Sequence, residues 1–166
     1  MSITKYTSYD EVRVVLGVAK KELKDEELEL PVFETLLLLE LDDLSTGIVP
    51  LYDSIEALDP LVTPPTPAQT RFLRVCDAYA TYFVAKLAGE AMPMFGLARI
   101  TDGKAEQQRF EGSQDVMAAI KARLAELKVK LAAAFANAGG TGAIEATATF
   151  THARASALTF DPVTNA

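Results

Sequence analysis

The sequence predicts a mainly α protein: a small helical bundle of about four to five helices, followed by an extended or β-hairpin C-terminal arm. Apolar residues recur at steps of three and four along most of residues 1–138, as they do on one face of a helix. Several of these stretches begin with capping residues and end at glycine. After the glycines at 139, 140 and 142 the pattern changes to a period of two. We therefore divide the chain into a helical bundle, 1–138, and a Gly-hinged extended arm, 139–166.

The bulk composition limits the classes of function. The chain has 166 residues, of which 49% are hydrophobic, which suffices for one domain with its own core. A single cysteine excludes an internal disulfide, and the net charge of −7 argues against non-specific binding of nucleic acid. We expect no membrane span, and the first five residues lack the apolar core of a signal peptide. These features predict a protein that resides at first in a reducing cytosol.

The first elements are predicted from local signals. Ser8 can cap a short helix, Glu11 can complete its capping box, and Gly17 can end it. Pro31 leaves two alternatives: a helix begins near Asp25 and kinks at Pro31, or an extended piece ends there and Pro31 opens the next helix. Residues 32–44 are predicted to be helical in either case.

The helix over 32–44 is unusually rich in leucine, with leucines at 36–39 and at 41. An element that is apolar nearly all round is buried from more than one side. In a monomer it would be the central helix of the bundle; in an oligomer it could lie between copies. The Asp42–Asp43 pair at its end has no histidine or further carboxylate at ligand spacing, so we interpret it as a helix rim followed by a turn.

A short helix over 51–58 and a proline-rich connector are predicted to precede the longest helix. Thr66 and Gln69 can form its capping box, and Pro67 fits the first helical position. We expect this helix to end near Gly89 and to bury Cys76. Its apolar face comprises Phe72, Val75, Cys76, Tyr79, Tyr82, Phe83 and Leu87.

Two segments are predicted to follow the long helix. Residues 91–104 are apolar, contain proline and glycine and close on a polar turn, so we expect a packed loop. A last helix should run from about Gln114 to Ala138. The face of this helix opposite its apolar residues carries Lys121, Arg123, Lys128 and Lys130.

The C-terminal arm is too small to form a stable sheet by itself. Residues 145–154 alternate with a period of two, and residues 157–160 do so more weakly. A hinged extended segment that has no core of its own becomes ordered by packing against another surface. It would lie on its own bundle, or it would pair with a neighbouring copy or another partner.

Charge is distributed unevenly along the chain. Residues 20–60 contain three basic and twelve acidic residues, whereas residues 99–131 contain seven basic and five acidic residues. One interpretation is ordinary solvated surface. The other is head-to-tail association, in which the acidic region of one copy meets the less acidic region of the next.

No catalytic, cofactor-binding or metal-ligating pattern stands out, so we expect a protein that is not an enzyme and needs no cofactor. The glycines at 139 and 140 follow a helix instead of preceding one, which is the wrong context for a phosphate loop. The single cysteine and the single histidine, His152, are separated in sequence by the whole last helix, and no zinc-finger spacing occurs.

The order of motifs resembles the head–tail connector (adaptor or head-completion) proteins of tailed bacteriophages. The resemblance covers roughly residues 6–135, and the segment with Asp102, Lys104, Arg109 and Phe110 is its most specific part. The similar runs are YTSYDEVR at 6–13, LG at 16–17, AYATYFVA at 78–85, MPMF at 92–95, ITDGKAE at 100–106 and RF at 109–110.

The resemblance implies a helical bundle that assembles as a ring of about twelve copies under the portal. Such a ring extends the channel for genomic DNA, which passes without sequence-specific binding, and presents a surface to the tail or the next neck protein. An extended arm commonly docks on the portal. The implied location is the virion neck, and the host cytoplasm during assembly.

The sequence also nominates interface residues for contacts between subunits or with the portal. An alternative function is a cytosolic helical homo-oligomeric scaffolding or regulatory protein. The nominated residues are Arg99, Asp102, Lys104, Arg109, Phe110, Phe150, His152, Arg154 and Phe160.

Overall fold

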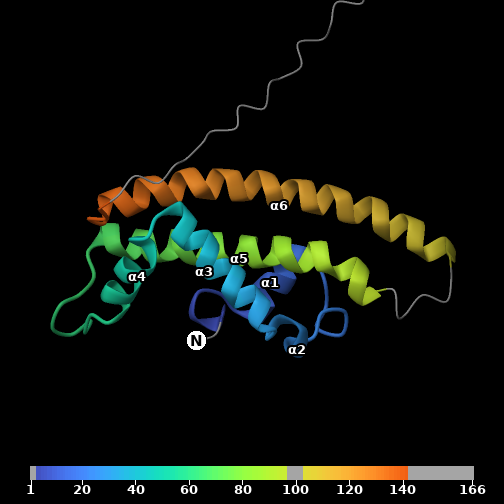
Figure 1. Cartoon of the computed structure of the whole chain (residues 1–166), viewed down its shortest axis with the longest axis horizontal. Helices are drawn as coiled ribbons and strands as arrows, with labels where there is room; N and C mark the ends of the chain where they lie inside the picture. The colour runs from blue at the N-terminus through green and yellow to red at the C-terminus, as the bar shows by residue number, and fades with distance from the viewer. Residues whose placement is uncertain (1–2, 97–102, 142–166) are drawn as a thin grey trace, which may run out of the picture.

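The computed structural model describes residues 3–96 and 103–141, with side chains described for 3–92 and 115–141. Within these residues the chain is mainly helical and contains no strand, which confirms the predicted fold class. Figure 1 shows the elements in order. They are the 3-10 helix η1 (Ile3–Lys5) and the α-helices α1 (Tyr9–Leu16), α2 (Asp25–Leu28), α3 (Pro31–Leu44), α4 (Ile48–Glu56), α5 (Pro67–Gly96) and α6 (Gly103–Asn137).

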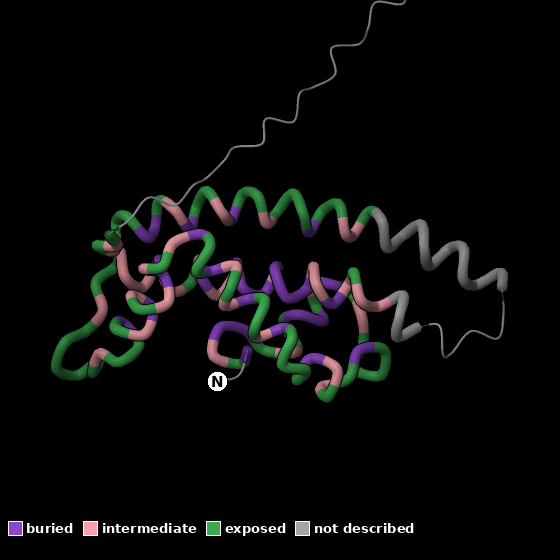
Figure 2. Tube along the Cα trace, viewed as in Figure 1, coloured by how far each residue is buried: buried purple, intermediate pink, exposed green. Residues whose placement is uncertain are grey.

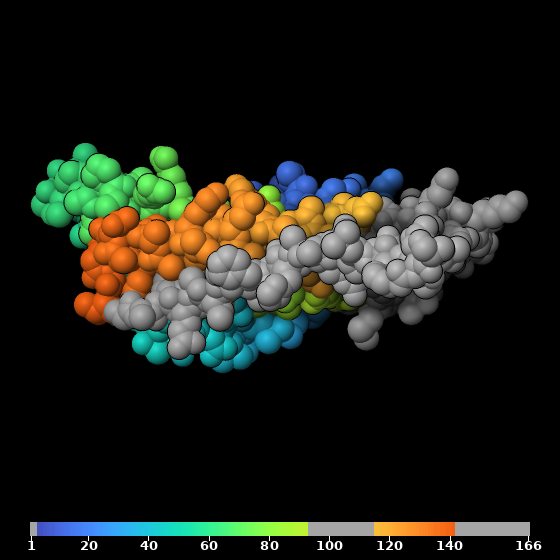
Figure 3. Space-filling model, turned by 90° about the horizontal axis from the view of Figure 1, so that it is seen from above, coloured from blue at the N-terminus to red at the C-terminus, as the bar shows by residue number. Residues whose placement is uncertain are grey.

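Helix α5 is the centre of the bundle. It contacts α6, α1, α3 and α4, and its contact with α6 is the most extensive in the described structure. The two long helices run antiparallel, and the shorter helices pack on the other sides of α5 (Figure 1). Seen from above, α1 and α3 lie on opposite sides of α6 (Figure 3). The stretch that the sequence marks with the longest apolar face is therefore the one around which the other elements pack.

The predicted capping boxes are confirmed. The Glu11 backbone N–H donates to Ser8 Oγ at 3.2 Å, and the Ser8 N–H donates to Glu11 Oε2 at 3.0 Å. At the start of α5 the Gln69 N–H donates to Thr66 Oγ1 at 3.3 Å, and the Thr66 N–H donates to Gln69 Oε1 at 2.8 Å. Gly17 ends α1 with a φ of 69°, a left-handed conformation that glycine adopts without steric cost.

Both alternatives at Pro31 are partly correct. A short helix, α2, begins at Asp25 as the first alternative requires, but it ends at Leu28. Pro31 then opens α3 at the first helical position, where its missing N–H would have had no partner within the helix. Helix α4 begins at Ile48, three residues before the prediction, because a proline at position 50 is tolerated within a first helical turn.

The predicted end of α5 and the predicted start of α6 are wrong, whereas α6 ends at Asn137, within one residue of its predicted end. Helix α5 continues past Gly89 to Gly96, and α6 begins at Gly103, well before Gln114. Gly89 lies inside the helix at a point of close packing: a Cβ there would lie 2.5 Å from Met117 Sδ of α6. The segment predicted as a packed loop is therefore helical over 91–96 and from 103 onward, and residues 97–102 lie outside the described part.

The core lies between α5 and the helices that surround it. Figure 2 shows the buried residues concentrated on α5, on the α6 face toward it and on the inner faces of the short helices. Cys76 is fully buried, as predicted. The α5 and α6 residues of this core include Phe72, Cys76, Tyr79, Phe83, Val84, Ile120, Leu127, Leu131 and Phe135.

The turn after α6 packs onto the end of the bundle. The Gly140 N–H donates to the Phe135 carbonyl at 2.9 Å, and Gly139 adopts a φ of 91°. A Cβ on Gly140 would lie 2.5 Å from the Phe135 ring, and one on Gly47 would lie 2.9 Å from it. The described part of the predicted hinge is thus a turn closely fitted to Phe135. The rest of the arm, 142–166, lies outside the described residues.

Candidate interaction surface

The interface residues predicted from the sequence fall in two places. Lys104, Arg109 and Phe110 belong to the first turns of α6, where the helical backbone is described without its side chains. Helix replaces the loop that was predicted to hold Lys104. The remaining six lie outside the described residues: Arg99, Asp102, Phe150, His152, Arg154 and Phe160. The described surface contains none of these side chains and offers its own candidates for interaction.

Helix α3 has one buried and one exposed apolar face. Phe33, Leu37, Leu41 and Leu44 point into the core. The prediction that α3 is the central helix of a monomeric bundle is wrong, because α5 holds that place and α3 packs against only one side of it. Its exposed apolar side chains, which we call the α3 stripe, are Val32, Leu36 and Leu39, with 50%, 38% and 54% of their surface exposed.

The α3 stripe is continuous because its members follow helical spacing. Residues 32, 36 and 39 are four and three apart, so their side chains lie above one another on one side of α3. Isolated exposed leucines are ordinary on a protein surface, whereas a contiguous apolar row along one helix is a candidate interaction surface. The sequence had left open a position of this helix between copies, and the exposed stripe keeps that alternative.

The outer side of α6 carries a second apolar row that the sequence analysis missed. Val129 is 53% exposed, although it lies about two turns inside the C-terminal end of the helix. Small residues continue the row at alternating steps of four and three, out of phase with the core positions. We call this row, with the lysines beside it at 128 and 130, the α6 outer face. Its apolar members are Ala118, Ala122, Ala125, Val129, Ala132 and Ala136.

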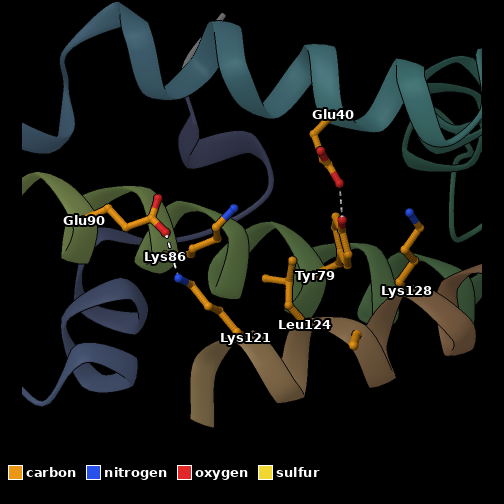
Figure 4. A pocket seen from close by; sticks show the side chains of 8 residues that line it. Glu40, Tyr79, Lys86, Glu90, Lys121, Leu124 and Lys128 are labelled. Atoms are coloured by element: carbon orange, nitrogen blue, oxygen red, sulfur yellow. Dashed lines mark hydrogen bonds and ion pairs between the residues drawn. The ribbon is translucent and has the colours of Figure 1, made fainter. Parts of the chain in front are cut away.

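A shallow open groove of about 390 Å³ lies between α3, α5 and α6 (Figure 4). Tyr79 forms part of it and donates its hydroxyl to Glu40 Oε1 at 2.5 Å. Lys121 Nζ lies 3.3 Å from Glu90 Oε1 across the groove. Only the Glu90–Lys121 pair is neutralised across the groove, and Lys86 and Lys128 form no ion pair with a described residue.

Polar groups inside the bundle serve to hold its elements together. Thr7 and Thr81 share a hydrogen bond of 2.8 Å between α5 and the segment before α1. The Tyr52 hydroxyl donates to Asp77 Oδ1 at 2.7 Å and thus links α4 to α5. The Tyr6 hydroxyl is buried without a partner among the described residues. None of these groups lines the groove between α3, α5 and α6, and the two hydrogen bonds each join two segments of the bundle, so we assign them to stability.

Asp77 gives the fold a specific pH dependence. Burial raises the pKa of Asp77 from 3.8 to about 6, against the opposing effect of the Tyr52 hydrogen bond. Because the folded-state pKa is the higher one, this carboxyl favours folding below about pH 4, and that contribution is lost as the pH rises through about 6. We expect Asp77→Asn to gain about 1–2 kcal/mol of unfolding free energy over wild type between these limits, since partial exposure reduces the full effect.

The measurement for Asp77→Asn is urea denaturation at several pH values. The matched control is Glu29→Gln, which removes an exposed carboxylate without a described side-chain partner and should parallel wild type. A difference between Asp77→Asn and wild type that stays constant with pH would contradict the assignment.

The described part of the chain contains neither a metal-holding cluster nor a helix that could span a membrane. Within it, no three His, Cys, Asp or Glu side chains are grouped so that they could hold a metal ion. Burial raises the pKa of the Cys76 thiol, which therefore stays protonated and unreactive. None of the helices in this part combines the length and apolar character required to cross a bilayer.

Comparison of the chain with protein-family models, with curated proteins and with solved structures finds no match.

Proposed function

We propose that this chain is a structural head–tail connector (adaptor) protein of a tailed bacteriophage. In this proposal it forms a ring of about twelve copies under the portal, extends the DNA channel and joins the head to the tail. It works by binding, without catalysis or a cofactor, in the virion neck after assembly in the host cytoplasm. The specific assignment to phage derives from the motif order over residues 6–135.

The single structural observation that supports this proposal is the α3 stripe. The chain already buries a full core, so Val32, Leu36 and Leu39 are not needed to complete it. An apolar row along one helix is suited to repeated packing between copies, as a ring requires. The net charge of −7 is compatible with a DNA channel, because an acidic wall repels the phosphate backbone and lets it slide.

The same stripe supports a second candidate, a cytosolic scaffolding or regulatory homo-oligomer. A homodimer could bury Leu36 and Leu39 between two copies without any phage partner. The two functions differ in their partners, so binding to a portal separates them.

The test is light-scattering mass on a sizing column, first for the protein alone and then with the portal protein of the same phage genome. A complex with about one copy per portal subunit is the expected result. A stable free dimer that does not co-elute with the portal and is missing from purified virions would reject the connector in favour of the scaffolding homo-oligomer.

The portal-docking role of the arm has its own experiment. A chain truncated after Thr141 retains the described core, including the turn on Phe135, so its thermal midpoint should stay close to that of the full chain. We expect it to lose co-elution with the portal. A Phe150→Ala, Phe160→Ala variant keeps the length of the arm and tests its aromatic side chains. Unchanged binding by the truncated chain would remove the arm from the docking surface.

A further inference from the structure

We propose that the α3 stripe of one copy packs against the α6 outer face of a second copy, in a head-to-tail contact. This contact names the two surfaces that would join neighbouring subunits. Its place in a ring rests on the proposed function. Its evidence, however, is the shape and charge of the described surface.

The α6 outer face is long enough to receive α3, and the side chains of the two surfaces are complementary in size. Helix α3 is 14 residues long, and the described side chains of α6 continue over a longer stretch, from 115 to the end of the helix. Leucines project from α3, whereas the centre of the α6 outer face consists of alanines and Val129. Large side chains on one helix fit against small ones on another, because the small residues let the helices approach closely.

The two surfaces also have opposite charge. Helix α3 contains four acidic residues and no basic residue. Asp42 and Asp43 lie in its last turn, where the helix dipole is already negative, and neither has a partner among the described residues. On α6, Lys128 is without an ion pair in the described chain, and Lys130 is 3.8 Å from Glu126. A second copy would place these lysines beside the unpaired carboxylates.

The arrangement of the helices makes the contact heterologous. Both α3 and α6 pack on α5, and from above α3 lies at one edge while α6 runs along the middle of the molecule (Figure 3). The α3 stripe and the α6 outer face therefore look in different directions. Each copy can offer one surface to each of two neighbours, which is the condition for a ring or a filament.

The experiment reverses charge on each surface in the purified full-length chain. One variant is Asp42→Lys, Asp43→Lys and the other is Lys128→Glu, Lys130→Glu. Asp42, Asp43 and Lys130 are exposed and Lys128 is partly exposed, so circular dichroism should report an unchanged fold. Sedimentation equilibrium of the wild-type chain, at protein concentrations up to about 1 mM, should show self-association. We expect each variant to associate at least about tenfold more weakly, because like charges then face each other.

Combining the two reversals decides the geometry. A chain that carries all four substitutions again pairs opposite charges across an α3–α6 contact, so its association should return to within about threefold of wild type. An equimolar mixture of the two separate variants should associate for the same reason. In a contact between two α3 stripes, by contrast, the α6 reversal would have no effect and the combined chain would not recover.

Apolar variants provide an independent measurement. Leu36→Ser, Leu39→Ser should abolish self-association. Val14→Ser is the matched control, because Val14 is 79% exposed on α1 and lies outside both surfaces. The proposal is overturned by a wild-type chain that stays monomeric at the highest concentration, by reversals without effect, or by a combined chain no better than the weaker single variant. These measurements need no portal, so they can succeed even if the connector function fails, and portal binding can fail or succeed separately.

Discussion

Phe135→Ala is expected to lower the free energy of unfolding by about 3–5 kcal/mol, the range for truncating a buried phenylalanine. The Phe135 side chain is 1% exposed, and its ring centroid lies 5.9 Å from that of Phe72. The backbone of Gly47 and Gly140 approaches the ring closely. Because the ring joins the end of α6 to the beginnings of α4 and α5, its loss leaves a cavity that rigid backbone on two sides cannot close.

Urea denaturation followed by circular dichroism measures this loss. Phe135→Leu is the control, because it keeps much of the apolar volume, and it should cost about 1–1.5 kcal/mol. Gly140→Ala gives a second test: its Cβ would lie 2.5 Å from the Phe135 ring, so it should be strongly destabilising in wild type and less so in the Phe135→Leu background. Equal costs in both backgrounds would contradict the close packing.

The second large effect is expected at Arg13. Arg13→Ala should lower the free energy of unfolding by about 3 kcal/mol. Arg13 is 4% exposed in spite of its charge. Its Nε donates to the Leu23 carbonyl and its Nη1 to Asp10 Oδ1, both at 2.8 Å, and Nη2 donates to Asp25. The guanidinium thus fastens α1 to the segment that leads into α2, and alanine leaves the Leu23 carbonyl without its donor.

Thermal denaturation and hydrogen exchange over residues 18–28 report the effect of Arg13→Ala. Arg13→Lys should recover only part of the stability, since one ammonium group cannot serve three acceptors in the same directions. Lys20→Ala is the surface control: Lys20 also pairs with Asp25 but is 70% exposed, so less than about 0.5 kcal/mol should be lost. Equal losses for Lys20→Ala and Arg13→Ala would show that burial of the guanidinium contributes nothing.

Sequence patterns predicted those features that depend on neighbouring residues. Ser8 with Glu11 and Thr66 with Gln69 form capping boxes because each pair is three residues apart, within reach of its own helical turn. The burial of Cys76 follows in the same way from its place on a regular apolar face. These signals place the starts of α1 and α5 and identify α5 as the element with the widest core face.

Gly89 shows why other features could not be predicted locally. A glycine after an apolar helix usually marks its end, and Gly17 behaves in this way. Gly89 lies within α5, where Met117 approaches it from α6. The same local signal therefore has two outcomes, and the helix on the opposite side decides between them. Arg13 was missed for a similar reason, since its acceptors at Leu23 and Asp25 are distant in sequence.

The interaction surface also has some features that the sequence shows and others that only the fold decides. The leucines of α3 and the alanines of α6 are visible in the sequence, but periodicity cannot say which apolar face of a helix its own chain covers. Only the tertiary structure decides that Leu37 and Leu41 are buried in the core, whereas Leu36 and Leu39 remain exposed.

The sequence by itself thus determined the helical class, the capped helix starts and the central long helix, because these depend on residues within a few turns. The tertiary structure decided the helix ends, the buried arginine and the two exposed apolar rows, because each depends on contacts between segments far apart in the chain.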